Sequence, residues 1–276
     1  LQVVLDRVFR PTFARIEAEL LIKDLERIEA AVHREAEQLG VTAEDYASWE
    51  DMRTLVAQDS GAELPRALNR NILKTLGLDA IFVFDAVGHV KQSLRDPSTT
   101  SDSTREFTPT GFADQFPVIA SVRTQSAGDS ASSARRGLVR FANGRLVFAA
   151  AAPSLPPGGN GRALGTVVML RELDAAMAKR LGDQVRLPLQ FTAADPSGPA
   201  NAAKDAQTHV ENGHVEAVAW LRDPFGKPIA RYSVERTASI LGKGEDTLTV
   251  GAIGSLFMLS LVLAVLLLLL QISVVR

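Results

Sequence analysis

Residues 80–93 read Ala-Ile-Phe-Val-Phe-Asp-Ala-Val-Gly-His-Val-Lys-Gln-Ser and decide the fold class of this chain. The apolar run at 80–84 predicts a buried strand, and residues 89–93 predict the strand that pairs with it. The turn at 85–88, Asp-Ala-Val-Gly, lies between them, and aspartate and glycine both suit turn geometry. The stretch therefore predicts an antiparallel hairpin.

The pattern on either side of the hairpin predicts the rest of the architecture. Apolar residues recur at steps of three and four over 13–39, which predicts a long amphipathic helix in which Glu35 occupies one apolar position. Gly40 is expected to end this helix, and Thr42 with Asp45 offers a cap for a second one. Downstream, strands are predicted at 138–141, 145–150, 164–170, 215–221 and 228–234, with a short helix at 174–181. A long helix followed by antiparallel hairpins is typical of the α+β class.

The C-terminal part of the chain carries no charged residue between Asp246 and Arg276. About 20 apolar residues cross a bilayer core, so residues 251–271 predict a transmembrane helix. Arg276 beyond this helix favours a cytoplasmic C-terminus. We interpret residues 1–12 as the stump of a first transmembrane helix, 13–246 as an extracytoplasmic domain, and 247–276 as the exit helix with the start of a cytoplasmic region.

Composition restricts the possible functions. The 276 residues include no cysteine, and 30 basic residues nearly balance 32 acidic ones. A chain without cysteine has no disulfides, thiolate metal sites or cysteine nucleophile, and the charge balance argues against a nucleic-acid partner. The four histidines lack metal-ligand spacing, so neither a metal nor a cofactor is expected. No nucleophile with a paired base is apparent, so an enzyme is not expected either.

Three carboxylates and an aromatic ring lie within two predicted helical turns, at Asp45, Trp49, Glu50 and Asp51. One interpretation is a ligand clamp, in which the carboxylates hold a cation or amine and Trp49 covers it. The other is structural, with Trp49 in the core and the acids capping helices or forming salt bridges.

Arg171 and Asn71 are the other candidates for ligand binding. Arg171 ends an apolar strand, where its guanidinium can bind a carboxylate ligand or pair with Asp45 or Asp51 inside the domain. Asn71 lies near the end of a helix predicted over 64–73, where it can donate to a ligand or cap the backbone.

Several segments together resemble the fourth type of CHASE domain, a class of extracellular sensory modules associated with cyclases and histidine kinases. The segments are FARIE (13–17), DLER (24–27), DYASWED (45–51), NIL (71–73), LDAIFVFD (78–85) with Gly88, GLV (137–139), VFAAAAP (147–153) and GTVVMLRELD (165–174). Where the family commonly has two aspartates after the tryptophan, this chain has Glu50 and then Asp51.

This resemblance implies a PAS-like, Cache-like sensor domain in the periplasm, anchored in the bacterial inner membrane. It implies relay of a ligand or stress signal to a cytoplasmic diguanylate cyclase or phosphodiesterase, hence cyclic-di-GMP signalling, or to a histidine kinase. The expected partners are an unknown small molecule or periplasmic protein, the membrane and a second copy of the chain. The alternative is a ligand-free dimerisation or protein-interaction module, because the helix over 13–39 can pack on a second copy.

Overall fold

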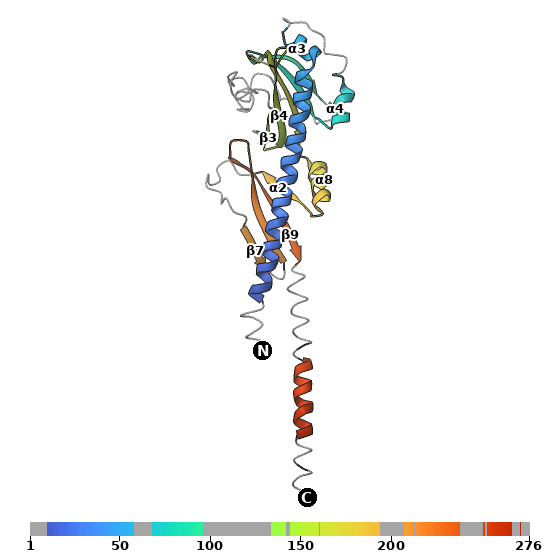
Figure 1. Cartoon of the computed structure of the whole chain (residues 1–276), viewed down its shortest axis with the longest axis vertical. Coiled ribbons are helices and arrows are strands. Elements are labelled where there is room, and N and C mark those ends of the chain that lie inside the picture. The colour runs from blue at the N-terminus through green and yellow to red at the C-terminus, as the bar shows by residue number, and fades with distance from the viewer. Residues whose placement is uncertain are drawn as a thin grey trace. The chain divides into compact units, whose positions relative to one another are not determined.

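The computed structural model describes residues 10–57, 68–95, 134–141, 144–159, 161–193, 207–211, 214–237, 251, 253–266 and 271. These residues form a long helix, shorter helices and two antiparallel sheets (Figure 1), so the predicted α+β class is confirmed. They fall into two compact units, one within 26–205 and 219–233 and the other within 1–25, 206–218 and 234–276.

The long helix α2 (Arg10–Ser48) is one continuous element of 39 residues (Figure 1). Contrary to the prediction, it does not end at Gly40. Thr42 lies inside the helix, where its Oγ1 donates to the Gln38 carbonyl at 2.9 Å, and so it does not cap a second helix. A Cβ at Gly40 would overlap the Arg136 side chain, so this glycine permits close packing rather than ending the helix.

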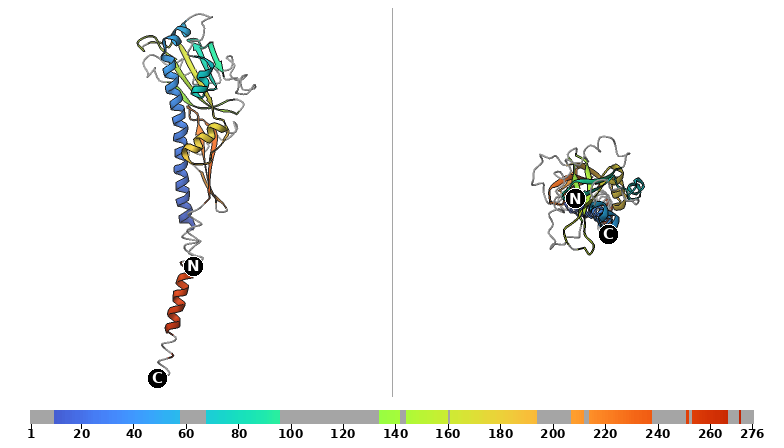
Figure 2. Two further views of the ribbon diagram at one scale, coloured as in Figure 1. Left: turned by 90° about the vertical axis from the view of Figure 1, so that its right-hand side faces the viewer. Right: turned by 90° about the horizontal axis from the view of Figure 1, so that it is seen from above.

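Two short helices follow α2. The first, α3 (Glu50–Ala57), buries Met52, Leu55 and Val56. The second, α4 (Arg70–Leu76), ends at Gly77, which adopts the left-handed conformation with φ 62° that glycine reaches at low cost. Figure 2 shows α4 beside the strands that follow it in the chain.

The five-stranded sheet contains β1 (Ala80–Asp85), β2 (Val90–Arg95), β3 (Arg135–Arg140), β4 (Leu146–Ser154) and β5 (Gly165–Glu172). Its order is β2-β1-β5-β4-β3, and the neighbouring strands are antiparallel. The hairpin predicted at 80–93 is present as β1–β2, and the strands predicted at 138–141 and 145–150 pair as β3–β4. Their register places β5 in the centre, between β1 and β4.

Both faces of this sheet are apolar, which agrees with the unbroken hydrophobic runs in β1, β4 and β5. One face carries a core cluster of Ala80, Phe82, Phe84, Phe141, Val147, Ala149, Ala151, Val168 and Leu170. On the edge of that face, the Arg95 guanidinium lies 5.2 Å from the centre of the Phe82 ring. The other face approaches α3 so closely that a Cβ at Gly165 would overlap Val56 and the Phe84 backbone.

The helix α8 (Ala175–Val185) follows β5 and is capped by Asp174, whose carboxylate accepts a hydrogen bond from the Met177 amide at 2.7 Å. The remaining strands are β6 (Gln190–Ala193), β7 (Gln207–Glu211), β8 (His214–Arg222) and β9 (Pro228–Thr237), in the order β6-β9-β8-β7. We did not predict β6 or β7, because both are short and partly polar. Phe191 of β6 pairs with the buried Tyr232 of β9, and their ring centres are 6.2 Å apart.

Residues 253–266 are helical and their side chains are exposed. In the part of the chain that the structure describes, no helix combines the length and apolar character needed to cross a membrane. Residues 247–250, 252, 267–270 and 272–276 of the C-terminal segment predicted at 247–276, and residues 1–9 of the predicted first stump, lie outside the described residues. Both membrane segments therefore stay predictions.

Candidate functional site

Arg171, near the end of β5, joins three elements of the larger unit. Its Nη1 lies 2.8 Å from Glu35 Oε2 of α2, and Nε and Nη2 donate to the carbonyls of Gly77 and Leu76 at 2.9 and 2.6 Å. The Arg171 and Glu35 side chains are only 14% and 12% exposed. The guanidinium therefore ties β5 to α2 and to the end of α4.

The electrostatics of this contact favour a charged arginine. The last carbonyls of α4 lack partners inside the helix and carry its negative end, so they attract a cation. Burial is the largest influence on Arg171 and lowers its pKa, while the neighbouring carboxylate of Glu35 acts in the opposite direction. The carboxylate of Glu35 and the carbonyls at the end of α4 thus offset part of the cost of burying the guanidinium charge.

A second arginine joins the same face of the sheet to α2. Arg136 of β3 forms ion pairs with Glu37, at 2.5 Å, and with Glu44, at 3.7 Å. Glu44 also accepts a hydrogen bond from the amide of Ala134. Arg171 lies opposite Phe148, and Phe148 lies opposite Leu138, two residues from Arg136, so both arginines project to one face. The helix is thus held to the sheet at two separate points.

The predicted clamp residues lie together where α2 ends and α3 begins. Trp49 connects the two helices and stacks on Tyr46, with 4.2 Å between the ring centres. Asp45, Glu50 and Asp51 are exposed around this aromatic pair. Burial, and then the charge of Asp45, raise the pKa of Tyr46. Tyr46 is buried and Trp49 is partly exposed, and Glu50 pairs with Arg53 at 2.7 Å. The corner thus places exposed carboxylates beside the partly exposed ring of Trp49.

Asn71 lies in the first turn of α4, not near the end of a helix as predicted. Its backbone amide donates to the side chain of Asn69 at 2.9 Å, so the capping residue is Asn69. Residues 64–67 of the predicted helix lie outside the described residues. The side chain of Asn71 is exposed and stays a candidate for ligand binding.

Arg171 does not join the predicted clamp. Its carboxylate partner is Glu35, not Asp45 or Asp51 as the internal-pairing alternative supposed. Glu35 and Asp45 are ten residues apart on one helix, which separates them by about 15 Å along its axis. The sequence did carry a signal for this pair, since Glu35 interrupts an otherwise apolar stripe and a buried charge requires a partner.

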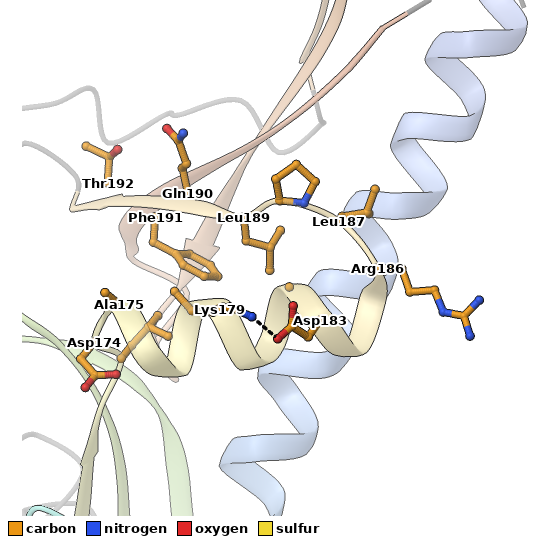
Figure 3. Close-up of a pocket in the computed structure, with 14 residues that line it drawn as sticks. Asp174, Ala175, Lys179, Asp183, Arg186, Leu187, Leu189, Gln190, Phe191 and Thr192 are labelled. Atoms are coloured by element: carbon orange, nitrogen blue, oxygen red, sulfur yellow. Dashed lines mark hydrogen bonds and ion pairs between the residues drawn. The ribbon is translucent and has the colours of Figure 1, made fainter. Parts of the chain in front are cut away.

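An open hollow of about 960 Å³ lies between α8 and the segment that leads into β6 (Figure 3). Leu189, just before β6, and Phe191 of β6 point toward the helix, and Ala175 and Gly182 also line the hollow. On its rim Lys179 pairs with Asp183 at 2.6 Å, and Arg186 points away from the helix. Asp174, which also lines the hollow, is engaged as the cap of α8.

In the described ranges, no group of three or more histidines, aspartates or glutamates is placed to hold a metal ion. Two arginines thus connect the five-stranded sheet to α2, and an exposed acidic corner lies at the C-terminal end of that helix.

Residues 31–192, more than half of the chain, match the family model described as the CHASE4 domain. Among curated proteins, none matches this sequence. A similar solved structure is the periplasmic domain of Vibrio cholerae LuxQ, with 10% identity and a TM-score of 0.50, covering 79% of this chain and 99% of that one. At this identity the likeness concerns the fold alone, which is Cache-like.

Two further solved structures have lower TM-scores. The extracellular domain of vpHK1S-Z8, a protein assigned as a histidine kinase, has 10% identity and a TM-score of 0.49, covering 85% of this chain and 96% of that one. A domain of a Vibrio parahaemolyticus protein assigned to the sensory box/GGDEF family has 11% identity and a TM-score of 0.46, with coverages of 83% and 99%.

Proposed function

This chain belongs to the CHASE4 domain family, whose members are extracellular or periplasmic sensor domains of signalling receptors, and we propose that its five-stranded sheet relays a ligand or stress signal through α2. In this proposal the domain lies in the periplasm of a bacterium. Residues 1–12 and 247–276 belong to the membrane-spanning parts of a receptor. The cytoplasmic output is a diguanylate cyclase, a cyclic-di-GMP phosphodiesterase or a histidine kinase.

The observation that carries the proposal is the attachment of α2 to the sheet. Apolar contacts alone allow side chains to slide past one another, but Arg171 and Arg136 each hold α2 carboxylates in a defined geometry. Separating a largely buried charge pair leaves an uncompensated charge, which costs about 3–5 kcal/mol. The sheet and the helix therefore move together when either one is displaced.

The proposed ligand site is the corner formed by Asp45, Trp49, Glu50 and Asp51. Exposed carboxylates beside stacked aromatic rings favour a cationic or amine ligand. Such a ligand shifts the receptor only if it binds one arrangement of α2 and α3 more tightly than another. Because its donors are occupied within the chain, Arg171 positions α2 in this proposal and does not contact the ligand.

A thermal-shift screen of the full chain in detergent tests the proposal, with amines, amino acids, organic acids and metal ions as probes. We expect a saturable rise in melting temperature with a member of the amine class. Asp45→Asn and Trp49→Phe should weaken the response at least tenfold. The matched control is Asp183→Asn, an exposed carboxylate on α8, and it should bind as the wild type does.

The relay step has its own measurement. With the amine bound, hydrogen exchange of amides in residues 26–48 should change, and Arg136→Gln should reduce that change while binding is kept. The control is Lys179→Gln, which breaks an exposed ion pair on α8. Lys179 is distant in the sequence from the carboxylates of α2. If no probe gives a saturable shift while the chain forms stable dimers, ligand sensing is excluded in favour of the ligand-free dimerisation or interaction module.

A further inference from the structure

The turn between β8 and β9, Asp223-Pro-Phe-Gly226, is held by several hydrogen bonds. The carboxylate of Asp223 accepts from the amides of Phe225 and Lys227 at 2.9 and 2.8 Å. The backbone of Asp223 also bonds to Lys227 and Gly226, at 2.8 and 2.9 Å. Arg222 donates to the Gly226 carbonyl at 2.8 Å. Together these hydrogen bonds make the turn at the tip of the β8–β9 hairpin rigid.

The β1–β2 hairpin has the same kind of turn, Asp85-Ala-Val-Gly88. Asp85 accepts from the amides of Val87, Gly88 and His89 at 2.9, 2.7 and 2.8 Å. Gly88 and Gly226 both have positive φ, 99° and 83°. The two turns differ at their two middle positions, which are Ala86 and Val87 in the first and Pro224 and Phe225 in the second. The β1–β2 turn has a similar hydrogen-bonding pattern without a proline, so Pro224 is not needed for the shape of the β8–β9 turn.

Pro224 packs on Gly137 of the edge strand β3. A Cβ at position 137 would overlap Cγ of Pro224 and lie 3.0 Å from its Cδ. The pyrrolidine ring has no flexible end that could swing aside, so a larger residue would push the whole turn away. Glycine at 137 therefore permits the contact by bringing the backbone of β3 directly against the ring.

Gly137 follows Arg136, which holds Glu37 and Glu44 of α2. Successive residues of a strand face opposite sides of the sheet. Residues 136 and 137 of β3 therefore contact α2 on one side and the β8–β9 turn on the other. A shift of β3 at this point would therefore displace both α2 and the β8–β9 turn.

We propose that the Pro224–Gly137 contact is a mechanical joint through which the five-stranded sheet sets the position of the β8–β9 turn. The hairpin matters because β9 leads in the chain to the C-terminal segment at 238–276. A signal that displaces β3 then reaches this segment through Pro224, in parallel with its path through α2. The signalling role of the joint rests on the proposed sensor function, whereas the joint itself does not.

Hydrogen exchange of the full chain in detergent, without ligand, tests the joint. In Gly137→Ala the clash with Pro224 should speed exchange of amides in β8 and β9 at least tenfold, while amides in β1 and β5 stay within about threefold of the wild type. Pro224→Ala alone should speed the same amides without a clash. In the double variant the exchange rates should match those of Pro224→Ala, since the methyl group added at position 137 then has no ring to displace.

Val139→Ala is the matched control, because Val139 lies on the same strand and face as Gly137 and packs on the core cluster. It should loosen β3 and β4 without a selective effect on β9. The joint is overturned if Pro224→Ala leaves exchange in β9 unchanged, or if Val139→Ala has the same pattern as Gly137→Ala. A failed ligand screen would count against the proposed sensor function and leave the exchange result intact.

Discussion

Arg171 and Glu35 are 136 residues apart in the sequence, and their side chains meet at 2.8 Å in a largely buried ion pair. The same guanidinium donates to the two carbonyls at the end of α4. One side chain thus satisfies a buried carboxylate and the end of a helix. It also connects β5, the central strand of the sheet, to α2.

Replacing Arg171 with alanine should destabilise the domain strongly. The substitution leaves the charge of Glu35 and two carbonyls without donors, and breaking a buried pair in this way costs about 3–5 kcal/mol. Urea unfolding followed by circular dichroism measures the loss. Lys179→Ala, which removes an exposed pair, should cost less than about 1 kcal/mol. The double variant Arg171→Met/Glu35→Met should be more stable than Arg171→Ala, and equal stability of the two would contradict this explanation.

Asp85→Asn should destabilise the β1–β2 turn at neutral pH and not at low pH. Burial alone would raise the pKa of Asp85, but hydrogen bonds from the amides of His89, Gly88 and Val87 outweigh it and lower the pKa below 3.8. A lowered pKa stabilises the fold above about pH 4, and this stabilisation is lost as the pH falls through the folded-state value.

We therefore expect Asp85→Asn to cost about 1–2 kcal/mol at pH 7, with the difference from the wild type shrinking below pH 4. Unfolding free energies measured from pH 2.5 to 7 give this comparison. The His89 ring is exposed and contacts Asp85 Oδ2 at 3.3 Å. His89→Ala should therefore change stability little. A difference that stays constant across the whole pH range would exclude the charged form as the cause.

Tyr232→Phe should reduce the loss of stability at alkaline pH. Burial, and then the charge of Glu29, raise the pKa of Tyr232 above the ordinary value of 10.0. The unfolded chain loses this proton near pH 10 while the folded chain keeps it. Stability present below pH 10 is therefore lost as the pH rises further, by up to about 1.4 kcal/mol per pH unit.

Denaturant unfolding between pH 8 and 11.5 should show a shallower decline in Tyr232→Phe than in the wild type. The pKa of Tyr46, the only other tyrosine, is also raised, so part of the slope should remain. Tyr46→Phe/Tyr232→Phe should remove that part as well. Identical slopes in the wild type and Tyr232→Phe would show that the phenol does not titrate differently in the two states.

Gly165→Ala should loosen the packing of the sheet on α3. The new methyl group would overlap Val56 and the Phe84 backbone, and overpacking of this kind typically costs about 1–3 kcal/mol. Thermal unfolding of the two chains measures the difference. Gly254→Ala is the control, because a Cβ there meets no atom within 4 Å. A Gly165→Ala variant as stable as the wild type would show that β5 can shift away from α3 at little cost.

Local pattern was sufficient to predict the strands β1–β5, β8 and β9 and the helix α8, because their apolar residues recur with the periods of strands and helices. It was insufficient at Gly40, where the prediction treated a glycine as a helix end. The reason for that glycine is Arg136, which lies on a strand 96 positions later and is brought against α2 only by the fold. The strands β6 and β7 were missed because short, partly polar segments carry little periodic signal.

The candidate site was predicted less completely. The proximity of Asp45, Trp49, Glu50 and Asp51 follows from helical spacing, so the sequence could predict it. The partner of Arg171 could not be selected in this way, because every acidic residue of the chain was a possible partner. The signal that the sequence offered for this pair was Glu35, a charged residue within an otherwise apolar helical stripe.

The sequence by itself determined the α+β class, the hairpins and the family, since these depend on periodicity and on motifs within short segments. The tertiary structure decided which charges pair and which backbones touch. Arg171 with Glu35 and Gly137 with Pro224 are contacts between elements far apart in the chain. Such contacts depend on strand order and register, and a shift of one residue in the register of β5 or β3 would turn Arg171 or position 137 to the opposite face of the sheet.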